Sequence, residues 1–493
     1  MPYVLALDQS TSATKALLFD REGRALDRES RDHRQFYPQP GWVEHDAEEI
    51  WQNALSVLRA VVARHPEKLT DLVCLSLTNQ RETVLIFDRA SGHPLHPALV
   101  WQCRRGTSLC AEFTAQGHAP GAHARTGLPL DPYFSASKLC HLLRQEPALR
   151  QRLREGTALI GTIDAYLIYR LTAGEVFACD TTNASRTLLF DLNRLDWDQD
   201  LCDLWEIPRR ALPEPRASDA SFGTTTLEGF LPRALQIRGV MGDSQAALFA
   251  HRSFSPGSVK VTLGTGSSIL LNIGDTPRFP SPRIPTTLAW QLGRQPTYAL
   301  EGIVISAGST LTWLRDQMGF VANVAEIDAL AASVGDNGGV YLVPAFTGLG
   351  LPYWNSSARA ALCGLTPHSD RRHVARAALE SIAFQLRDAL DALRVEAGVA
   401  LQDIRADGGP SASAVLMQIT ANLAGARLCV PKMAHCSPLG ATFAGLLGSG
   451  EFGSIADLSR LQQDEAVYTP QMPPPTVAAF LQDWHRAVKQ VSG

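Results

Sequence analysis

Two stretches of the chain, one at its start and one just after its middle, share the same order of apolar and polar positions. Residues 3–7 and 15–19 are largely apolar runs typical of buried strands, and the polar residues 8–14 separate them. The same order recurs in residues 258–263, 264–268 and 269–273. A repeated unit predicts two related domains. We expect an α/β fold with a cleft between an N-terminal domain, residues 1–248, and a C-terminal domain, residues 249–493.

The pattern between and after these units predicts further strands and helices. Residues 72–77 form a buried strand that delivers residues 78–83 at its carboxyl end, where open α/β sheets bind ligands. Residues 46–65 have the apolar spacing of one helical face, with Asp46 and Glu49 placed as a capping box. Strands are expected at 84–88 and 98–101, continuing the same sheet, and at 237–241 and 404–407; helices are expected from residue 160 and at 305–316, 373–393 and 414–423. The proline-containing tail after Gln471 is expected to be loosely held.

Size, charge and cysteine usage narrow the classes of function. The chain has 493 residues, of which 45% are hydrophobic and 19% charged, as in a soluble globular protein of more than one domain. Its net charge of −4 provides no basic field for nucleic acid, and no signal peptide or bilayer-spanning run is expected. Nine scattered cysteines suggest free thiols in the cytoplasm. The spacing His93-x-x-His96 is not expected to bind a metal.

A lone carboxylate, Asp243, stands in an apolar stretch near the middle of the chain. Val240 and Met241 precede it and Ala246 follows, which places the acid between the end of a strand and the start of a helix. Free N–H groups and the helix dipole stabilise an anion at such a position. Asp243 is therefore a candidate catalytic base. The alternative is that it only caps the helix.

The two hydroxyl-rich turns suggest a site for phosphate groups. Turns of Gly, Thr and Ser direct backbone N–H groups and hydroxyls into one small volume. Two such turns facing each other across a cleft suit a nucleotide polyphosphate, and Asp8 at the end of the first strand can hold Mg²⁺ through water. The alternative is a pair of ordinary hairpins. Neither a GxxxxGK[ST] motif nor a GxGxxG motif opening a helix is present.

A second group of residues suggests a site for a polyol or sugar. Glu82 beside Arg81 offers an acceptor and a donor for vicinal hydroxyls, while the aromatic faces of Trp101 and Tyr133 can cover a carbon chain. The alternatives are an exposed ion pair for Arg81 and Glu82 and a core position for Trp101.

These motifs are similar to those of the glycerol kinases in the FGGY carbohydrate kinase family. The resemblance runs from about residue 3 to about residue 450. Its most specific pieces are YPQPGWVEHD at 37–46, TNQRET at 78–83, VWQCRR at 100–105, DPYFS at 131–135, TNASRT at 182–187 and VPAFTGLG at 343–350. It implies two RNase H-like domains of the actin and hexokinase superfamily, and transfer of a phosphoryl group from ATP, with Mg²⁺, to a primary hydroxyl.

The resemblance also implies a set of site residues. Asp243 matches the base, and the polyol contacts match Arg81, Glu82, Trp101, Tyr133, Asp243, Ser244 and Ser268. The nucleotide contacts match Thr11, Ser12, Lys15, Thr265, Gly308, Gly409 and Ser413, with Asp8 for the metal.

Several of these positions depart from the family pattern. Ser244 stands where glycerol kinases have Gln, and Ser268 where they have Phe, which predicts a roomier pocket and a preference shifted from glycerol toward a longer polyol or a ketose. On the nucleotide side, Lys15 replaces Arg and Ser413 replaces Asn. Residues 227–231 lack the loop that binds fructose bisphosphate in regulated relatives, so no inhibition by that effector is expected.

The sequence thus predicts a cytoplasmic ATP-dependent kinase of a small polyol, forming a homodimer or homotetramer as the family commonly does. The alternatives are an FGGY kinase for erythritol, erythrulose or xylulose, and a non-catalytic, actin-like sensor that binds ATP and a sugar. Neither a nucleic acid nor a membrane is an expected partner.

Overall fold

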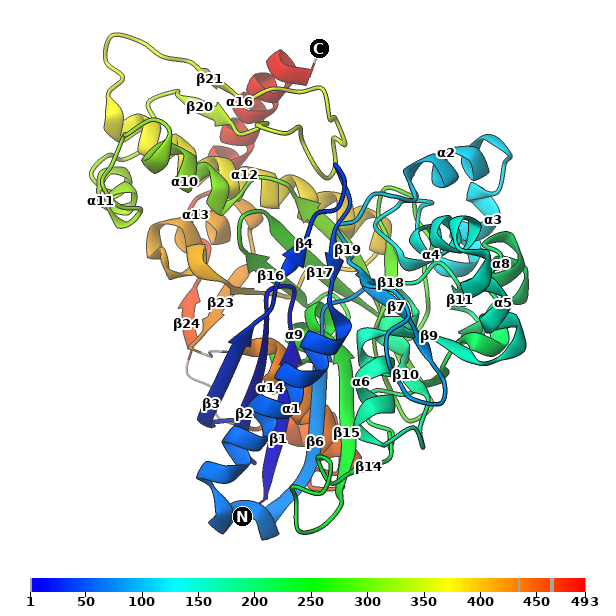
Figure 1. Cartoon of the computed structure of the whole chain (residues 1–493). Coiled ribbons are helices and arrows are strands. Elements are labelled where there is room, and N and C mark those ends of the chain that lie inside the picture. The colour runs from blue at the N-terminus through cyan, green and yellow to red at the C-terminus, as the bar shows by residue number, and fades with distance from the viewer. Residues whose placement is uncertain (1, 433–434, 462–464, 493) are drawn as a thin grey trace.

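The N-terminal half is built on a six-stranded sheet (Figure 1). The computed structural model describes residues 2–432, 435–461 and 465–492. The strand order is β14-β15-β6-β1-β2-β3, with bounds β1 (Tyr3–Gln9), β2 (Ala13–Asp20), β3 (Ala25–Asp32), β6 (Leu72–Asn79), β14 (Thr224–Thr225) and β15 (Leu235–Gly242). The first two strands form the predicted antiparallel hairpin. Strands β6 and β15 run parallel to β1, so residues 78–83 and Asp243 emerge at one edge of the sheet.

Residues 4–7 of strand β1 are all apolar because helices cover both faces of its sheet. Leu5 and Leu7 pack in one cluster with residues of α1 (Ala47–Arg64). Val4 and Ala6 point the other way and pack with Phe443 of α14 (Cys436–Gly448). A strand covered on both faces loses the alternation of polar and apolar residues.

The C-terminal half repeats this arrangement in a seven-stranded sheet. Its order is β18-β19-β17-β16-β22-β23-β24, with bounds β16 (Val259–Leu263), β17 (Ser267–Gly274), β18 (Thr286–Leu292), β19 (Gln295–Val304), β22 (Asp403–Asp407), β23 (Arg427–Pro431) and β24 (Glu465–Tyr468). Strands β16 and β17 form the second predicted hairpin, and β22 runs parallel to β16 as β6 does to β1. The repeat predicted from the sequence is therefore present in the fold.

A third, five-stranded sheet corrects two sequence predictions. Strands β7 (Val84–Asp88) and β8 (Ala98–Leu99) do not continue the first sheet; they join β4 (Gln35–Phe36), β5 (Glu44–His45) and β9 (Ala158–Thr162) in a separate one. Residues 160–162, expected to begin a helix, are the end of β9, and α6 (Ile163–Leu171) starts after them. The separate sheet forms because β7 pairs with β9 over five residue pairs, whereas β6 is already paired on both edges.

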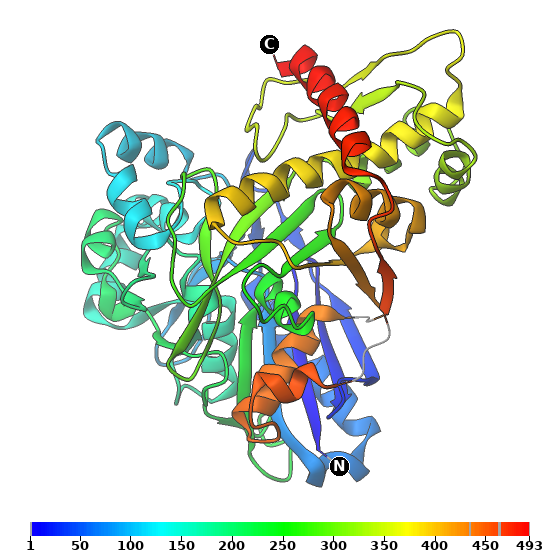
Figure 2. The same ribbon diagram turned by 180° about the vertical axis from the view of Figure 1, so that it is seen from behind.

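Helix α14 comes late in the chain yet packs on the six-stranded sheet of the N-terminal half. Figure 2 shows it, in orange, against the strands of the N-terminal half. It packs on α9 (Asp243–Ala250) with almost no space, since a Cβ added at Gly440 would lie 1.8 Å from the Ala246 carbonyl oxygen. The N-terminal half is thus completed by a segment from the other half of the sequence.

The tail after Gln471 is not loosely held as predicted. Residues 474–492 form α16 (Pro474–Ser492), which crosses α12 (Arg371–Ala397) (Figure 2). Trp484 is fully buried and stacks on Phe384 with ring centroids 5.1 Å apart. Its indole Nε1 donates to Asp388 Oδ2 at 2.7 Å. Prolines suit the first turn of a helix, where an N–H has no partner in any case.

The other helices lie around the three sheets. Their bounds are α2 (Thr107–Ala115), α3 (Ala119–Thr126), α4 (Ser135–Gln145), α5 (Pro147–Glu155), α7 (Thr181–Ala184), α8 (Gln199–Leu204), α10 (Gly308–Asp316), α11 (Ala325–Ala332), α13 (Ala414–Ala424) and α15 (Ile455–Ser459). Two-stranded pairs join β10 (Ala178–Asp180) to β13 (Glu214–Arg216), β11 (Phe190–Asp191) to β12 (Asp196–Trp197), and β20 (Tyr341–Val343) to β21 (Ala361–Cys363).

The start of α1 corrects one further prediction. The Asp46 side chain caps the helix by accepting from the N–H groups of Glu48 and Glu49. Glu49 does not complete a capping box; its carboxylate accepts from Arg34 Nε at 3.2 Å. Within the described ranges of the chain, no helix combines the length and the hydropathy that a membrane span requires.

Candidate active site

Asp243 is the first residue of α9, directly after β15. Gly242 is the N-cap, so the aspartate lies inside the first turn rather than at the cap. Its Oδ1 accepts from its neighbour's N–H, that of Ser244, at 2.6 Å and lies 3.3 Å from Arg81 Nε. The side chain is 39% exposed, which leaves the carboxylate open to a ligand. Because Gly242 pairs with Asn79 of β6, the carboxylate stands beside the segment that carries Arg81.

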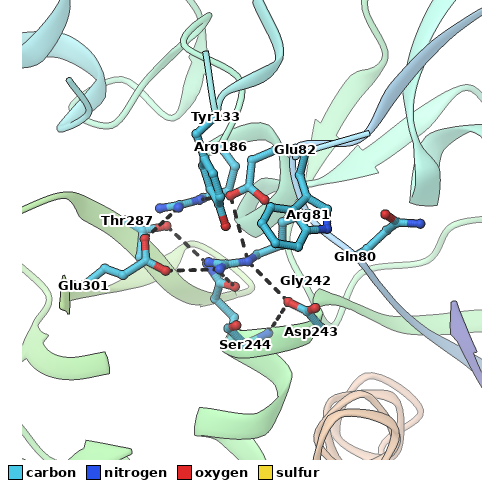
Figure 3. Close-up of polar contacts among 12 residues, drawn as sticks. Gln80, Arg81, Glu82, Tyr133, Arg186, Gly242, Asp243, Ser244, Thr287 and Glu301 are labelled. Carbon is cyan, nitrogen blue, oxygen red and sulfur yellow. Dashed lines mark hydrogen bonds and ion pairs between the residues drawn. The ribbon is translucent and has the colours of Figure 1, made fainter. Parts of the chain in front are cut away.

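Two arginines and two glutamates form a closed network beside Asp243 (Figure 3). Arg186 donates from Nε to Glu82 and from NH2 to Glu301, both at 2.6 Å. Arg81 NH2 donates to Glu301 at 3.1 Å. All four side chains are buried. The two arginines hold the pKa of Glu301 at about 2 despite its burial, whereas burial outweighs them at Glu82 and raises its pKa.

The network contains Arg81 and Glu82, which were predicted for the polyol site, and two further residues, Arg186 and Glu301. Glu301 lies on β19 of the C-terminal sheet, and Arg186 follows α7 of the N-terminal half, so the network joins the two halves. Sequence reasoning did not assign either residue to the site. Gln245 also contacts Arg81, with Oε1 accepting from NH1 at 3.4 Å.

The backbone at Glu82 adopts a conformation that side-chain-bearing residues avoid. Its φ is +62°, in the left-handed region. The Ser135 hydroxyl donates to the Glu82 carbonyl at 2.8 Å, and the arginine network holds its side chain. A left-handed residue of this kind costs about 1 to 3 kcal/mol and persists only where the surroundings fix it. The fold thus directs this carboxylate toward the arginines at an energetic cost.

Trp101 and Tyr133, the residues predicted to cover a carbon chain, lie in contact with each other. Their ring centroids are 5.5 Å apart at an angle of 63°. The Trp101 Nε1 donates to Thr11 Oγ1 at 3.0 Å, which ties this ring to the first hydroxyl-rich turn. Lys138, which sequence reasoning missed, is buried and donates to the carbonyls of Pro132 and Tyr133. Burial lowers its pKa to about 8.

A cavity of about 360 Å³ connects Asp243 with the other predicted carboxylate. Asp8, Lys15, Asp243, Ser244 and Lys260 line it together with residues of the C-terminal half. Lys15 Nζ lies 3.1 Å from Asp8 Oδ2, and burial raises the Asp8 pKa. Two carboxylates at one small polar cavity are a donor set that suits a hydrated Mg²⁺.

A second cavity, of about 580 Å³, lies in the C-terminal half. Three predicted nucleotide residues line it, namely Thr265, Gly308 and Gly409, with the apolar Trp313 and Leu311. A Cβ at Gly308 would lie 2.5 Å from the Gly264 carbonyl oxygen, so the close approach of these segments requires glycine there. An apolar cavity bordered by backbone groups suits a nucleotide base and sugar.

Four predicted site residues remain, all with hydroxyl groups: Thr11, Ser12, Ser268 and Ser413. Thr11 and Ser12 form the turn between β1 and β2. Ser268 pairs with Ile303, and two residues further along the same strand Leu270 pairs with Glu301. Side chains two residues apart on a strand point to the same face, so Ser268 faces the same side of the sheet as Glu301. Its hydroxyl is buried and has no hydrogen-bond partner in the described structure. The Ser413 hydroxyl caps α13 and donates to Asp328, so its hydrogen bonds are made within the protein.

Comparison with known proteins matches the chain over nearly its whole length. Residues 3–250 match the N-terminal domain, and residues 259–448 the C-terminal domain, of the FGGY family of carbohydrate kinases. The chain is 45% identical over 488 residues to a glycerol kinase of Dechloromonas aromatica, covering 99% of this chain and 97% of that one. It is 42% identical over 489 residues to glycerol kinase 1 of Thermotoga maritima, covering 99% of each.

Solved structures give the same result. The structure of a glycerol kinase from Plasmodium falciparum with ADP superposes with a TM-score of 0.95 at 34% identity, covering 100% of this chain and 98% of that one. A xylulose kinase from Rhodospirillum rubrum superposes with a TM-score of 0.87 at 25% identity, covering 99% and 98%. With two matching domain models and relatives of more than 40% identity over their full length, this chain belongs to the FGGY family of carbohydrate kinases, with the two-domain fold of the actin and hexokinase superfamily.

Proposed function

We propose that the protein transfers the γ-phosphoryl group of ATP to a primary hydroxyl of a small polyol, with Asp243 as the general base. The observation that carries the proposal is the position of Asp243. Its carboxylate borders the buried arginine and glutamate network on one side and the cavity of Asp8 and Lys15 on the other. A substrate hydroxyl bound at the network would therefore lie between the base and the phosphate site.

The polyol would be held by groups that the network has already oriented. Glu82 Oε1 accepts from Arg186 Nε, which leaves Oε2 to accept from a substrate hydroxyl. Arg81 offers donors, and the faces of Trp101 and Tyr133 cover the carbon chain. Groups fixed before the substrate binds lose little entropy on binding.

The nucleotide would span the two cavities. Its base and sugar suit the 580 Å³ cavity beside Gly308 and Gly409, and its phosphates extend toward the turn at Thr265 and toward Lys15. Asp8 would hold Mg²⁺ through water, and the bound ion would neutralise phosphate charge. Lys15 supplies positive charge from the protein itself.

A modest base is sufficient for this chemistry. Phosphoryl transfer depends chiefly on positioning and on neutralising charge, so the hydroxyl needs an acceptor for its proton late in the reaction. Both contacts of Asp243 fall on Oδ1, so Oδ2 is the oxygen that would receive the proton. Closure of the two halves would exclude water from the site. We place the reaction in the cytoplasm, where the nine free thiols stay reduced.

A second candidate substrate class is a longer polyol or a ketose. Ser244 borders the reaction cavity, and Ser268 lies on the face of the sheet that carries Glu301. Both serines are small, and the buried Ser268 hydroxyl has no hydrogen-bond partner in the described residues, so these positions would leave room for a longer carbon chain.

The test is ADP release by the full chain with MgATP across glycerol, erythritol, threitol, erythrulose, xylulose, ribulose and dihydroxyacetone. The proposal predicts turnover with at least one small polyol and a product phosphorylated on a primary hydroxyl. ADP release that no member of this set increases would reject it. The rank of kcat/KM decides between glycerol and the longer substrates.

A further inference from the structure

Three side chains with metal-binding atoms meet behind Asp243. His251 is the C-cap residue of α9, Asp407 ends β22, and Cys436 begins α14. One ligand atom from each lies within 4.8 Å of the other two. His251 Nε2 and Asp407 Oδ2 are 2.6 Å apart. None of the three residues is among those predicted from the sequence for the polyol, the nucleotide or Mg²⁺.

The cluster is built on rigid parts of the fold. The three ligands come from two helices and a strand, and α9 and α14 pack in direct contact at Gly440. His251 is fully buried, and its second nitrogen, Nδ1, is buried without a hydrogen-bond partner in the described residues. Ligands held by packed elements bind a metal without first having to be ordered.

The cluster is also open to solvent on one side. Asp407 and Cys436 line the cavity of about 360 Å³ that holds Asp8 and Asp243. An ion can therefore enter from this cavity. A water molecule or a phosphate oxygen can complete its coordination from the same direction.

The donor set selects the class of metal. One nitrogen, one carboxylate oxygen and one sulfur suit Zn²⁺ and similar transition-metal ions in tetrahedral geometry, with an open fourth position. Mg²⁺ prefers oxygen donors and octahedral geometry, so it favours the carboxylate of Asp8 and water. The two kinds of ion therefore prefer different side chains of the same cavity.

We propose that His251, Asp407 and Cys436 form a binding site for Zn²⁺ or a chemically similar divalent ion, distinct from the Mg²⁺ site. On binding, the Cys436 thiol releases its proton to water and the thiolate coordinates the ion. The bound ion lies in the wall of the reaction cavity and inhibits phosphoryl transfer. Lys260, which lines the same cavity, opposes the ion's charge and moderates its affinity.

The direct test is a titration of the full-length, chelator-treated protein with Co²⁺ as a spectroscopic probe. Binding of one equivalent is expected to give the visible bands of tetrahedral Co²⁺ and a thiolate-to-cobalt charge-transfer band, both removed by Zn²⁺. Cys436→Val removes the thiol and should abolish the charge-transfer band. Cys363→Ser changes another partly exposed thiol, in β21, and should keep it.

The outcomes separate the proposal from a purely structural role of the cluster. A wild-type protein without the charge-transfer band, or a band that persists in Cys436→Val, overturns the site. His251→Gln provides a second variant and should weaken Co²⁺ binding by at least the roughly tenfold typical of losing even an outer-shell partner. Melting in the presence of ADP checks that each variant is folded.

Inhibition is a separate readout, and it alone rests on the kinase activity. With saturating MgATP, Zn²⁺ should inhibit wild type and Cys363→Ser at the same concentration, and Cys436→Val only at a concentration about tenfold higher or more. Equal sensitivity of all three proteins would assign the inhibition to zinc bound by the nucleotide and overturn the regulatory role. The Co²⁺ spectrum requires no turnover, so failure of the site and failure of the proposed function are distinguishable.

Discussion

Removing the charge of Glu301 should destabilise the protein and weaken the contacts between its two halves. Glu301→Gln keeps the size of the side chain but leaves Arg81 and Arg186 with Glu82 as their one buried carboxylate partner in the described network, since Asp243 beside Arg81 is 39% exposed. Burial raises the pKa of Glu301, yet the two arginines lower it from 4.5 to about 2, so their effect exceeds the cost of desolvation by about 3 kcal/mol. Breaking a buried ion pair by removing one partner costs about 3 to 5 kcal/mol, which agrees with this value.

The assay is denaturant unfolding followed by fluorescence, with Asp391→Asn as the matched control. Asp391 pairs with Arg387 at 2.7 Å, yet its side chain is 37% exposed, so its loss should cost less than about 1 kcal/mol. Arg186→Met combined with Glu301→Gln should cost less than the sum of the single changes, because the double variant removes an unpaired charge.

The result that would refute the reasoning is a shift for Glu301→Gln no larger than that for Asp391→Asn. Such a result would mean that water screens the network in solution. It would also mean that the two halves are not held together by these four side chains.

Three further outcomes follow from other parts of the structure. Ser244→Gln combined with Ser268→Phe should raise the preference for glycerol over a tetritol by about 1 to 3 kcal/mol per site, and an unchanged substrate ranking would count against the pocket argument. Burial holds the pKa of His45 at about 3, below its unfolded value of 6.5, so the stability that the neutral ring gives above pH 6.5 is lost as the pH falls. Between pH 7 and pH 5 the free energy of unfolding of the wild type should fall by about 2 kcal/mol more than that of His45→Gln. Melting temperatures of the two proteins that change in parallel with pH would contradict this. Fructose bisphosphate should not inhibit, since Arg59 NH2 already binds the Leu227 carbonyl and the Glu228 carboxylate in that loop, and a clear inhibition curve would show otherwise.

Local patterns predicted the hairpins and long helices because their signals lie within one element. The apolar run of β1 and the helical spacing of α1 are of this kind. The end of β9 was missed because residues 160–162 lead directly into α6. The tail was misjudged because Pro474 was taken as a breaker, whereas it is the first residue of α16.

For the candidate site too, residues in short motifs could be predicted from the sequence, whereas residues brought together only by the fold could not. Asp243 and Arg81 were identified from short motifs at strand ends. Arg186 and Glu301 acquire their role only when segments 115 residues apart meet, which no local pattern reports. One signal was available: Glu301 is a single charge inside an apolar strand, and a buried charge requires a partner. Lys138 is likewise a charged residue that is buried, on α4, and so requires partners.

The most direct test of the account compares Asp243→Asn with the wild type at saturating MgATP and the preferred polyol. We predict that kcat falls about 100- to 10,000-fold, the range expected for loss of a general base. Polyol and ADP should still raise the melting temperature, because the network at Glu82 and the cavity at Gly308 are intact. A kcat within about tenfold of the wild type, with ligand binding preserved, would contradict the role of Asp243 as the base.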